Sequence, residues 1–502
     1  MNENKPFKPY IPADKVTPEC TAVSVIIGVI LAVVFGAANA YLGLRVGLTV
    51  SASIPAAVLS MGIIRVLMRR NSILESNIVQ TIGSAGESLA AGAIFTLPAL
   101  FLWAAEGKGE KPSLLAITVI ALCGGILGVL FMVPLRNALI VREHATLPYP
   151  EGTACAEVLL AGEEGGAQAA SVFSGLGIAA AFKFIVDGVK LAPTEINLTL
   201  KNFGAQIGTQ IYPALVGVGY IVGPRISSFM FVGGVIGWCV LIPMILLFGA
   251  DAAVYPGTAT VAEIFVQSGP SGLWSTYVKY IGAGAITTGG FISLIKSLPL
   301  IVRTFSDSMK SLKGGSAAGT LRTEQDLNMK VILIGIVLTT LVIWLFPAIP
   351  VNLLGAVLIV VFGFFFATVS SRMVGLVGST NNPVSGMAIA IGLYLPVQLN
   401  ACIMVGGLIA LAMNSRKKVS EEVKAAQYND GTLYSAGMIA GEGLVGILLA
   451  ILAVFNIDPS APAFLEPIRA FTNNTVGGIV VLAAIVLLLL KFSLWGKNRS
   501  RK

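Results

Sequence analysis

Apolar stretches long enough to cross a membrane recur along the whole chain, separated by short polar segments. A membrane-spanning helix needs ~20 mostly apolar residues. Residues 205–224 are Gly-rich and predict a short or broken span, and 373–413 has room for a single full crossing. We therefore expect an all-α polytopic membrane protein with ~12 to 13 membrane helices, some of them broken or re-entrant. The clearest spans fall near residues 21–44, 46–68, 77–103, 113–133, 169–190, 226–248, 274–302, 329–348, 350–370, 434–456 and 475–495.

The predicted span at 77–103 carries a row of polar residues. Asn77, Gln80, Ser84 and Glu87 follow one another at intervals of three and four, so they share one stripe of a helix. An ionisable residue in such a place marks a functional site by default. A low-dielectric surrounding disfavours the charged carboxylate, which suits a group that takes up and releases a proton. We interpret Glu87 as a proton-coupling residue and its neutral neighbours as substrate ligands; permanent ion pairing and contacts that only join helices are the alternatives.

Three similar segments indicate internal repeats, which are common in transporters. Tyr41, Tyr220 and Tyr394 each open an apolar run rich in small residues, and a second Gly-rich helix follows each run. Glu87 and Glu442 follow the first and third tyrosines at nearly the same distance, and each comes directly after a glycine. We therefore predict repeated helix pairs and assign Glu442 the same proton-coupling role. Chance similarity between helices rich in small residues is the alternative.

Composition and charge support a membrane protein. Hydrophobic residues make up 55% of the 502 residues and charged residues only 12%, well below the quarter or so of a soluble domain. The net charge of +8 comes from Lys and Arg in short tracts between apolar runs. Such tracts fix orientation in a membrane, so we expect cytoplasmic N- and C-termini and no nucleic-acid partner. The five cysteines have no metal-binding spacing, so we expect no metal site and no cofactor.

The longest basic loop divides the chain. It lies within residues 303–328 and is polar and rich in Gly and Ser, which is typical of a flexible connection. We expect a first transmembrane half at 1–302, a cytoplasmic loop at 303–328, and a second, shorter half at 329–502.

Polar residues at span boundaries supply further candidate substrate ligands. Tyr41 and Arg45 end the first span, where Arg attracts a carboxylate or extends its charge to the membrane surface. Asn381, Asn382 and Ser385 surround a helix-breaking proline, as in the unwound segments of broken-helix carriers.

One ion pair and one isolated histidine have structural interpretations. Lys183 and Asp187 are spaced i,i+4 within one span and predict an ion pair. His144 is the single histidine and falls in a predicted cytoplasmic loop, so no His-rich metal site is expected.

Four long motifs resemble the oligopeptide transporter family, whose members include the yellow-stripe-like carriers of metal chelates. They read NIVQTIGSAGESLAAGAIFTLPAL, LPYPEGTACAEVLLAGE, STNNPVSGMAIA and SAGMIAGEGLVG. The resemblance covers nearly the whole chain. It implies a bacterial inner-membrane protein that imports small peptides, or metal complexes of peptide-like chelators, by proton-coupled symport with alternating access. The partners that the resemblance implies are the substrate, protons and the lipid bilayer. A homo-oligomer is a further possibility that the sequence does not decide.

The chain departs from the family pattern near residues 386–391. Family members usually insert further spans there, with an acidic Gly-Asp-rich motif, whereas the flanking motifs abut in this chain. Residues 373–413 then contain a re-entrant element, or the chain is an internally shortened member that does not transport. We expect a transporter with its site between residues 77–87, 381–385 and 441–442. An enzyme is not expected, since nucleophile-elbow and zinc-binding motifs are lacking.

Overall fold

The computed structural model describes residues 9–46, 52–70, 72–142, 149–164, 166–200, 203–289, 326–377, 386–416, 419–455 and 474–494, with a few isolated positions. Most of the predicted connecting loop at 303–328 and the C-terminal tail lie outside these ranges.

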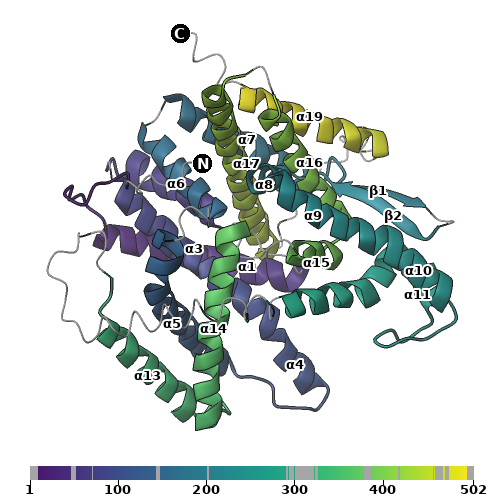
Figure 1. Cartoon of the computed structure of the whole chain (residues 1–502), viewed down its shortest axis with the longest axis horizontal. Coiled ribbons are helices and arrows are strands. Elements are labelled where there is room, and N and C mark those ends of the chain that lie inside the picture. The colour runs from purple at the N-terminus through teal and green to yellow at the C-terminus, as the bar shows by residue number, and fades with distance from the viewer. Residues whose placement is uncertain are drawn as a thin grey trace.

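The first part of the chain forms a series of helices (Figure 1). Two of them are short: α2 lies beside long α3, and Pro98 opens α4 directly after α3 ends. These helices are α1 (Ala22–Val46), α2 (Ser53–Met61), α3 (Ile73–Thr96), α4 (Pro98–Ala105), α5 (Leu114–Arg136), α6 (Pro150–Glu164) and α7 (Gly166–Lys183). The predicted span at 77–103 is therefore longer than expected and broken at Leu97, because proline lacks the N–H that continues a helix.

The rest of the described chain is also mainly helical. Several helices are extended by one widened π-helical turn, namely η1 (Gly62–Leu67), η2 (Asn137–Arg142), η3 (Phe184–Gly188), η4 (Ile236–Leu241) and η5 (Trp274–Val278). The remaining helices are α8 (Pro213–Val222), α9 (Pro224–Val235), α10 (Ile242–Gly249), α11 (Val261–Leu273), α13 (Met329–Leu345), α14 (Leu353–Val377), α15 (Gly386–Tyr394), α16 (Val397–Asn414), α17 (Glu421–Val454) and α19 (Thr475–Leu494).

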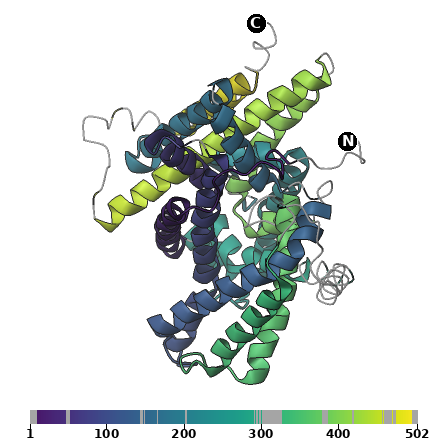
Figure 2. The ribbon, with the colours of Figure 1, turned by 90° about the vertical axis from the view of Figure 1, so that its left-hand side faces the viewer.

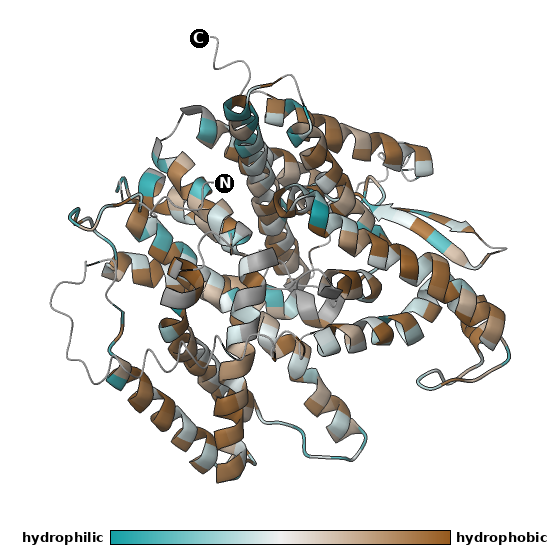
Figure 3. Ribbon diagram, viewed as in Figure 1, coloured by the Kyte–Doolittle hydropathy of each residue, from teal (hydrophilic) through white to brown (hydrophobic). Residues whose placement is uncertain are grey.

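Eight helical stretches in the described residues are long and apolar enough to cross a membrane, and four shorter apolar helices accompany them. Apolar residues cover most of α5, α13 and α14, while hydrophilic residues gather in the first turns of α17 (Figure 3). These features confirm the predicted polytopic helical membrane protein.

One segment corrects the predicted all-helical chain. Residues 205–210 form β2 (Ala205–Gln210), which pairs antiparallel with β1 (Glu195–Leu200), so the span predicted at 205–224 is a strand followed by α8. Gly204 has a φ of 71° in the turn between the strands, a conformation that glycine adopts without strain. The hairpin packs against α16, where the Gln398 amide donates to the Asn197 side chain at 2.8 Å.

The two most extensive helix–helix contacts, α1 with α3 and α7 with α17, each belong to a group of three helices. In the first helix trio, α3 runs along α1 and contacts α2; in the second helix trio, α17 runs along α7 and contacts α8. A separate group of α5, α13 and α14 packs together at the other end of the molecule from α17 (Figure 2). The buried cores of α2, α6, α7 and α17 are continuous, so the helices on either side of the predicted connecting loop share one core.

Candidate functional site

Glu87 lies in α3, and its side chain is directed at the start of α2. Only 1% of this ionisable residue is exposed. The backbone N–H of Ala52 and the hydroxyl of Ser88 are its hydrogen-bonding neighbours, and Glu151 at the start of α6 is a charged neighbour. Within the described part of the chain, the Glu87 Oε1 atom has no hydrogen-bond partner. Because an unpartnered buried carboxylate oxygen is costly, this carboxyl suits a site that exchanges a proton.

The predicted polar stripe is only partly buried. Gln80 is half-buried, and its amide donates to the Ser53 carbonyl oxygen at 3.4 Å, so Gln80 and Glu87 both face the start of α2. Ser84 donates to the carbonyl oxygen of Thr81 in its own helix at 3.2 Å. Asn77 is exposed. The structure therefore brings Gln80 and Glu87 together but leaves Asn77 outside this buried group.

Glycine positions Glu87 against the neighbouring helix. A Cβ on Gly86 would lie 2.2 Å from the carbonyl oxygen of Ala32 in α1. Only glycine permits this approach of two helix backbones. The side chain of the next residue, Glu87, is thereby held beside the start of α2.

Glu442 belongs to a second polar group that joins α7, α8 and α17. Its Oε2 accepts the backbone N–H of Ala214, in the first turn of α8, at 2.8 Å. Its Oε1 lies 3.6 Å from the Lys183 ammonium. Lys183 itself lies closer to Asp187, at 2.6 Å, which confirms the predicted i,i+4 ion pair. The Tyr212 hydroxyl donates to the other oxygen of Asp187 at 3.0 Å.

The long-range part of this cluster was not predicted. Lys183 and Asp187 were expected to pair within one helix, but their proximity to Glu442 depends on how α17 packs along α7. Two features of the sequence pointed to this site: Lys183 is a cation within an apolar run, and Pro213 is a typical first residue of a helix. Both are far from Glu442 in the sequence, so their contact with it could not be predicted.

The other predicted ligands are only partly described. Tyr41 is half-buried near the end of α1, and the Arg45 side chain lies outside the described residues. Asn381, Asn382 and Ser385 also lie outside them. The predicted meeting of residues 77–87, 381–385 and 441–442 therefore stays a prediction.

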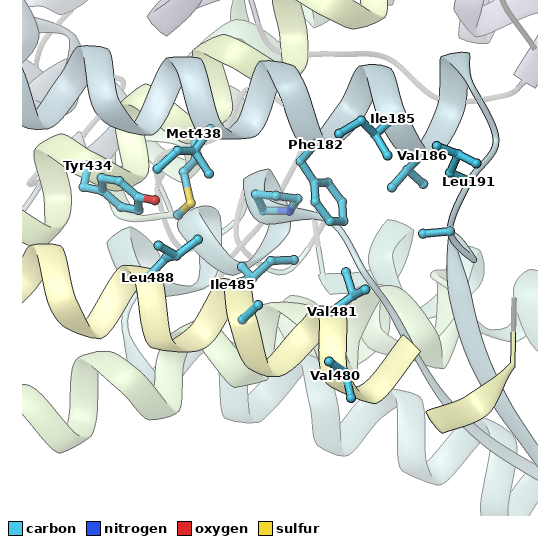
Figure 4. A pocket seen from close by; sticks show the side chains of 14 residues that line it. Phe182, Ile185, Val186, Leu191, Tyr434, Met438, Val480, Val481, Ile485 and Leu488 are labelled. Atoms are coloured by element: carbon cyan, nitrogen blue, oxygen red, sulfur yellow. The ribbon is translucent and has the colours of Figure 1, made fainter. Parts of the chain in front are cut away.

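An apolar cavity of about 370 Å³ lies between α7, α17 and α19 (Figure 4). Phe182, Val186, Met438 and Ile485 contribute to a wall that is almost entirely hydrocarbon. The cavity offers no charged group to the termini of a peptide, so we do not place the substrate there. Nor do three Asp, Glu, His or Cys side chains of the described chain come together as metal ligands.

Comparison with known proteins places these features in a family. The family model described as "OPT oligopeptide transporter protein" matches residues 19–390 and 385–453. The two matched stretches meet at 385–390, where the sequence departs from the family pattern. A curated relative from Haemophilus influenzae, named "Putative oligopeptide transporter", is 32% identical over 369 residues, which cover 70% of this chain and 55% of the relative. The chain thus spans about half the length of that relative. It is a multi-pass membrane protein that belongs to the OPT oligopeptide transporter family.

Proposed function

We propose that the protein imports small peptides by proton-coupled symport with alternating access, and that Glu87 binds the coupled proton. The observation that carries this proposal is the buried Glu87 carboxyl, whose Oε1 atom has no hydrogen-bond partner among the described residues. No ion pair joins Glu87 to a Lys or Arg among the side chains that the structure describes. A proton is then the simplest means of neutralising this carboxyl.

The position of Glu87 connects proton binding to helix movement. The start of a helix carries partial positive charge and favours an adjacent carboxylate. Glu87 faces the start of α2 when ionised, and protonation weakens that attraction. A change of protonation therefore biases the packing of α2 against α3, which is the kind of differential interaction that a transport cycle requires.

The substrate assignment rests on the family. Gln80 contributes amide groups beside Glu87 that suit a peptide backbone. Asn381, Asn382 and Ser385 remain proposed ligands on the sequence pattern alone.

Uptake into proteoliposomes tests this function. Labelled di- to tetrapeptides should accumulate when an inward proton gradient is applied, and accumulation should stop when a protonophore collapses the gradient. Chelated iron serves as the competing substrate. Peptide uptake that does not respond to the gradient would contradict proton coupling, whereas gradient-driven uptake of the chelate alone would assign the protein to metal-chelate transport.

A further inference from the structure

We propose that Glu442 is a second proton-binding site, equivalent to Glu87, and that Lys183 and Asp187 form a neutral pair that leaves this carboxyl free to bind a proton. The inference deepens the proposed function and rests on it only for the use of the proton in transport. The observation behind it is that the two helix trios are built alike around their glutamates.

The glycine before each glutamate makes the same backbone contact. A Cβ on Gly441 would lie 2.1 Å from the carbonyl oxygen of Leu176 in α7, as one on Gly86 would lie 2.2 Å from that of Ala32 in α1. In both trios the backbone of the long helix therefore lies in close contact with its neighbour at the residue before the glutamate.

A second contact, one turn earlier, gives the same register. A Cβ on Gly437 would lie 2.0 Å from the Val172 carbonyl oxygen, and one on Gly28 would lie 2.7 Å from the Ile82 Cβ. Gly437 and Ile82 each precede the contact glycine of their helix by four residues, and Val172 and Gly28 occupy matching places on the partner helices. In the second trio the glycine of this contact lies on the long helix α17, and in the first it lies on the partner helix α1. The paired positions are the same in both trios.

Each glutamate also faces the start of a short helix. Ala52 lies at the start of α2 and Ala214 in the first turn of α8, and their backbone N–H groups are directed at Glu87 and Glu442 respectively. One carboxylate oxygen is thus supplied with a donor in both trios. The other oxygen is Oε1 in each case. Among the described residues Glu87 Oε1 has no hydrogen-bond partner, whereas Glu442 Oε1 lies 3.6 Å from the Lys183 ammonium, which is closer to Asp187, at 2.6 Å.

The register identifies what differs between the trios. Lys183 lies two helical turns after Leu176, and the matching position after Ala32 is Asn39. Asp187 lies one turn further on, where the first trio has Gly43. The second trio therefore contains one extra cation and one extra anion, and these two are paired with each other at 2.6 Å.

The two extra groups consequently add no net charge to the second trio. Both oxygens of Asp187 face donors, one from Tyr212 and one from Lys183, so Asp187 is the carboxylate that Lys183 neutralises. Cys402 of α16 is a neutral neighbour of Glu442, and Glu151 adds a further negative charge near Glu87. Once Lys183 is assigned to Asp187, each trio retains, among the described side chains, one glutamate without a cation of its own. A buried carboxyl in that state favours its protonated form.

Infrared difference spectroscopy on the purified protein in liposomes tests the inference without measuring transport. E157Q protein serves as the background for every variant, because the buried Glu157 carboxyl also takes up a proton near pH 7. In this background a pH titration should show the carbonyl band of two protonated carboxylic acids. E87Q and E442Q should each remove about half of its intensity. D187N should also remove the Glu442 contribution, because the released Lys183 ammonium then neutralises Glu442.

The double variant K183M/D187N is the decisive control, because it removes the pair and gives the second trio the charge content of the first. It should restore the band to its original intensity, and adding E442Q should halve it again. Full intensity in E442Q or in D187N, or no recovery in the double variant, would overturn the inference. If the band behaves as expected but peptide uptake ignores the proton gradient, the proposed function fails and the two protonation sites stand.

Discussion

Gly441 of α17 lies so close to Leu176 of α7 that a Cβ at residue 441 would come within 2.1 Å of the Leu176 carbonyl oxygen. The backbones of the two helices therefore touch one residue before Glu442. This contact sets the position of the Glu442 carboxyl relative to Lys183 and the start of α8.

Replacing that glycine should destabilise the protein. G441A forces two backbones apart, and overpacking of this kind typically costs ~1–3 kcal/mol. The melting temperature in detergent should fall. Gly446 in the same helix has no atom within 4 Å of an added Cβ, so G446A should leave the melting temperature unchanged or raise it, because Ala favours helices by up to ~1 kcal/mol over Gly. Equal effects of the two substitutions would contradict the close packing of α7 and α17.

Glu157 of α6 should make stability depend on pH. This helix is not among the candidate membrane spans, and burial raises the pKa of Glu157 to about 7. A carboxyl whose pKa is higher in the folded state favours folding most at low pH, and that contribution is lost as the pH rises through about 7. The melting temperature should therefore fall between mildly acidic and mildly alkaline pH, and E157Q should reduce the fall. The exposed Glu110 provides the matched control, and E110Q should keep the wild-type dependence of melting temperature on pH. If E157Q also kept the wild-type dependence, Glu157 would not titrate in this range.

Cysteine labelling tests the burial of the helices. Cys20 is exposed, whereas Cys155 and Cys402 are buried. A maleimide reacts with an accessible thiolate, so it should modify Cys20 in the folded protein, and C20S should remove most of the early labelling. Cys155 and Cys402 should react only after denaturation. Rapid modification of C20S/C123S/C239S, which retains only Cys155 and Cys402, by a membrane-permeant maleimide would contradict the packing around α6 and α16.

The sequence predicted features that depend on local pattern. Apolar length located most of the spans, and the i,i+4 spacing predicted the ion pair of Lys183 with Asp187, which is confirmed at 2.6 Å. The repeat of a glycine followed by Glu87 or Glu442 has a structural counterpart in the two helix trios. The sequence repeat paired Glu442 with the run that begins at Tyr394, however, whereas its short helix is α8.

Features that depend on long-range packing were not predictable. The strand at 205–210 was overlooked because a Gly-rich apolar run resembles a short span when only its composition is considered. Likewise, Asn77 shares a helical stripe with Glu87 but is exposed, because the direction of burial depends on the neighbouring helices α1 and α2. Periodicity identifies a face, and tertiary contacts decide what that face meets.

Proton movement in E87Q tests the central claim most directly. Wild-type protein in liposomes that contain a pH-sensitive dye should acidify the interior when peptide is added outside without a pre-existing gradient. E87Q should lose this acidification while retaining exchange of labelled for unlabelled peptide, because exchange needs the binding site but no net proton movement. Acidification by E87Q at the wild-type rate would contradict the assignment of Glu87 as a proton-coupling residue.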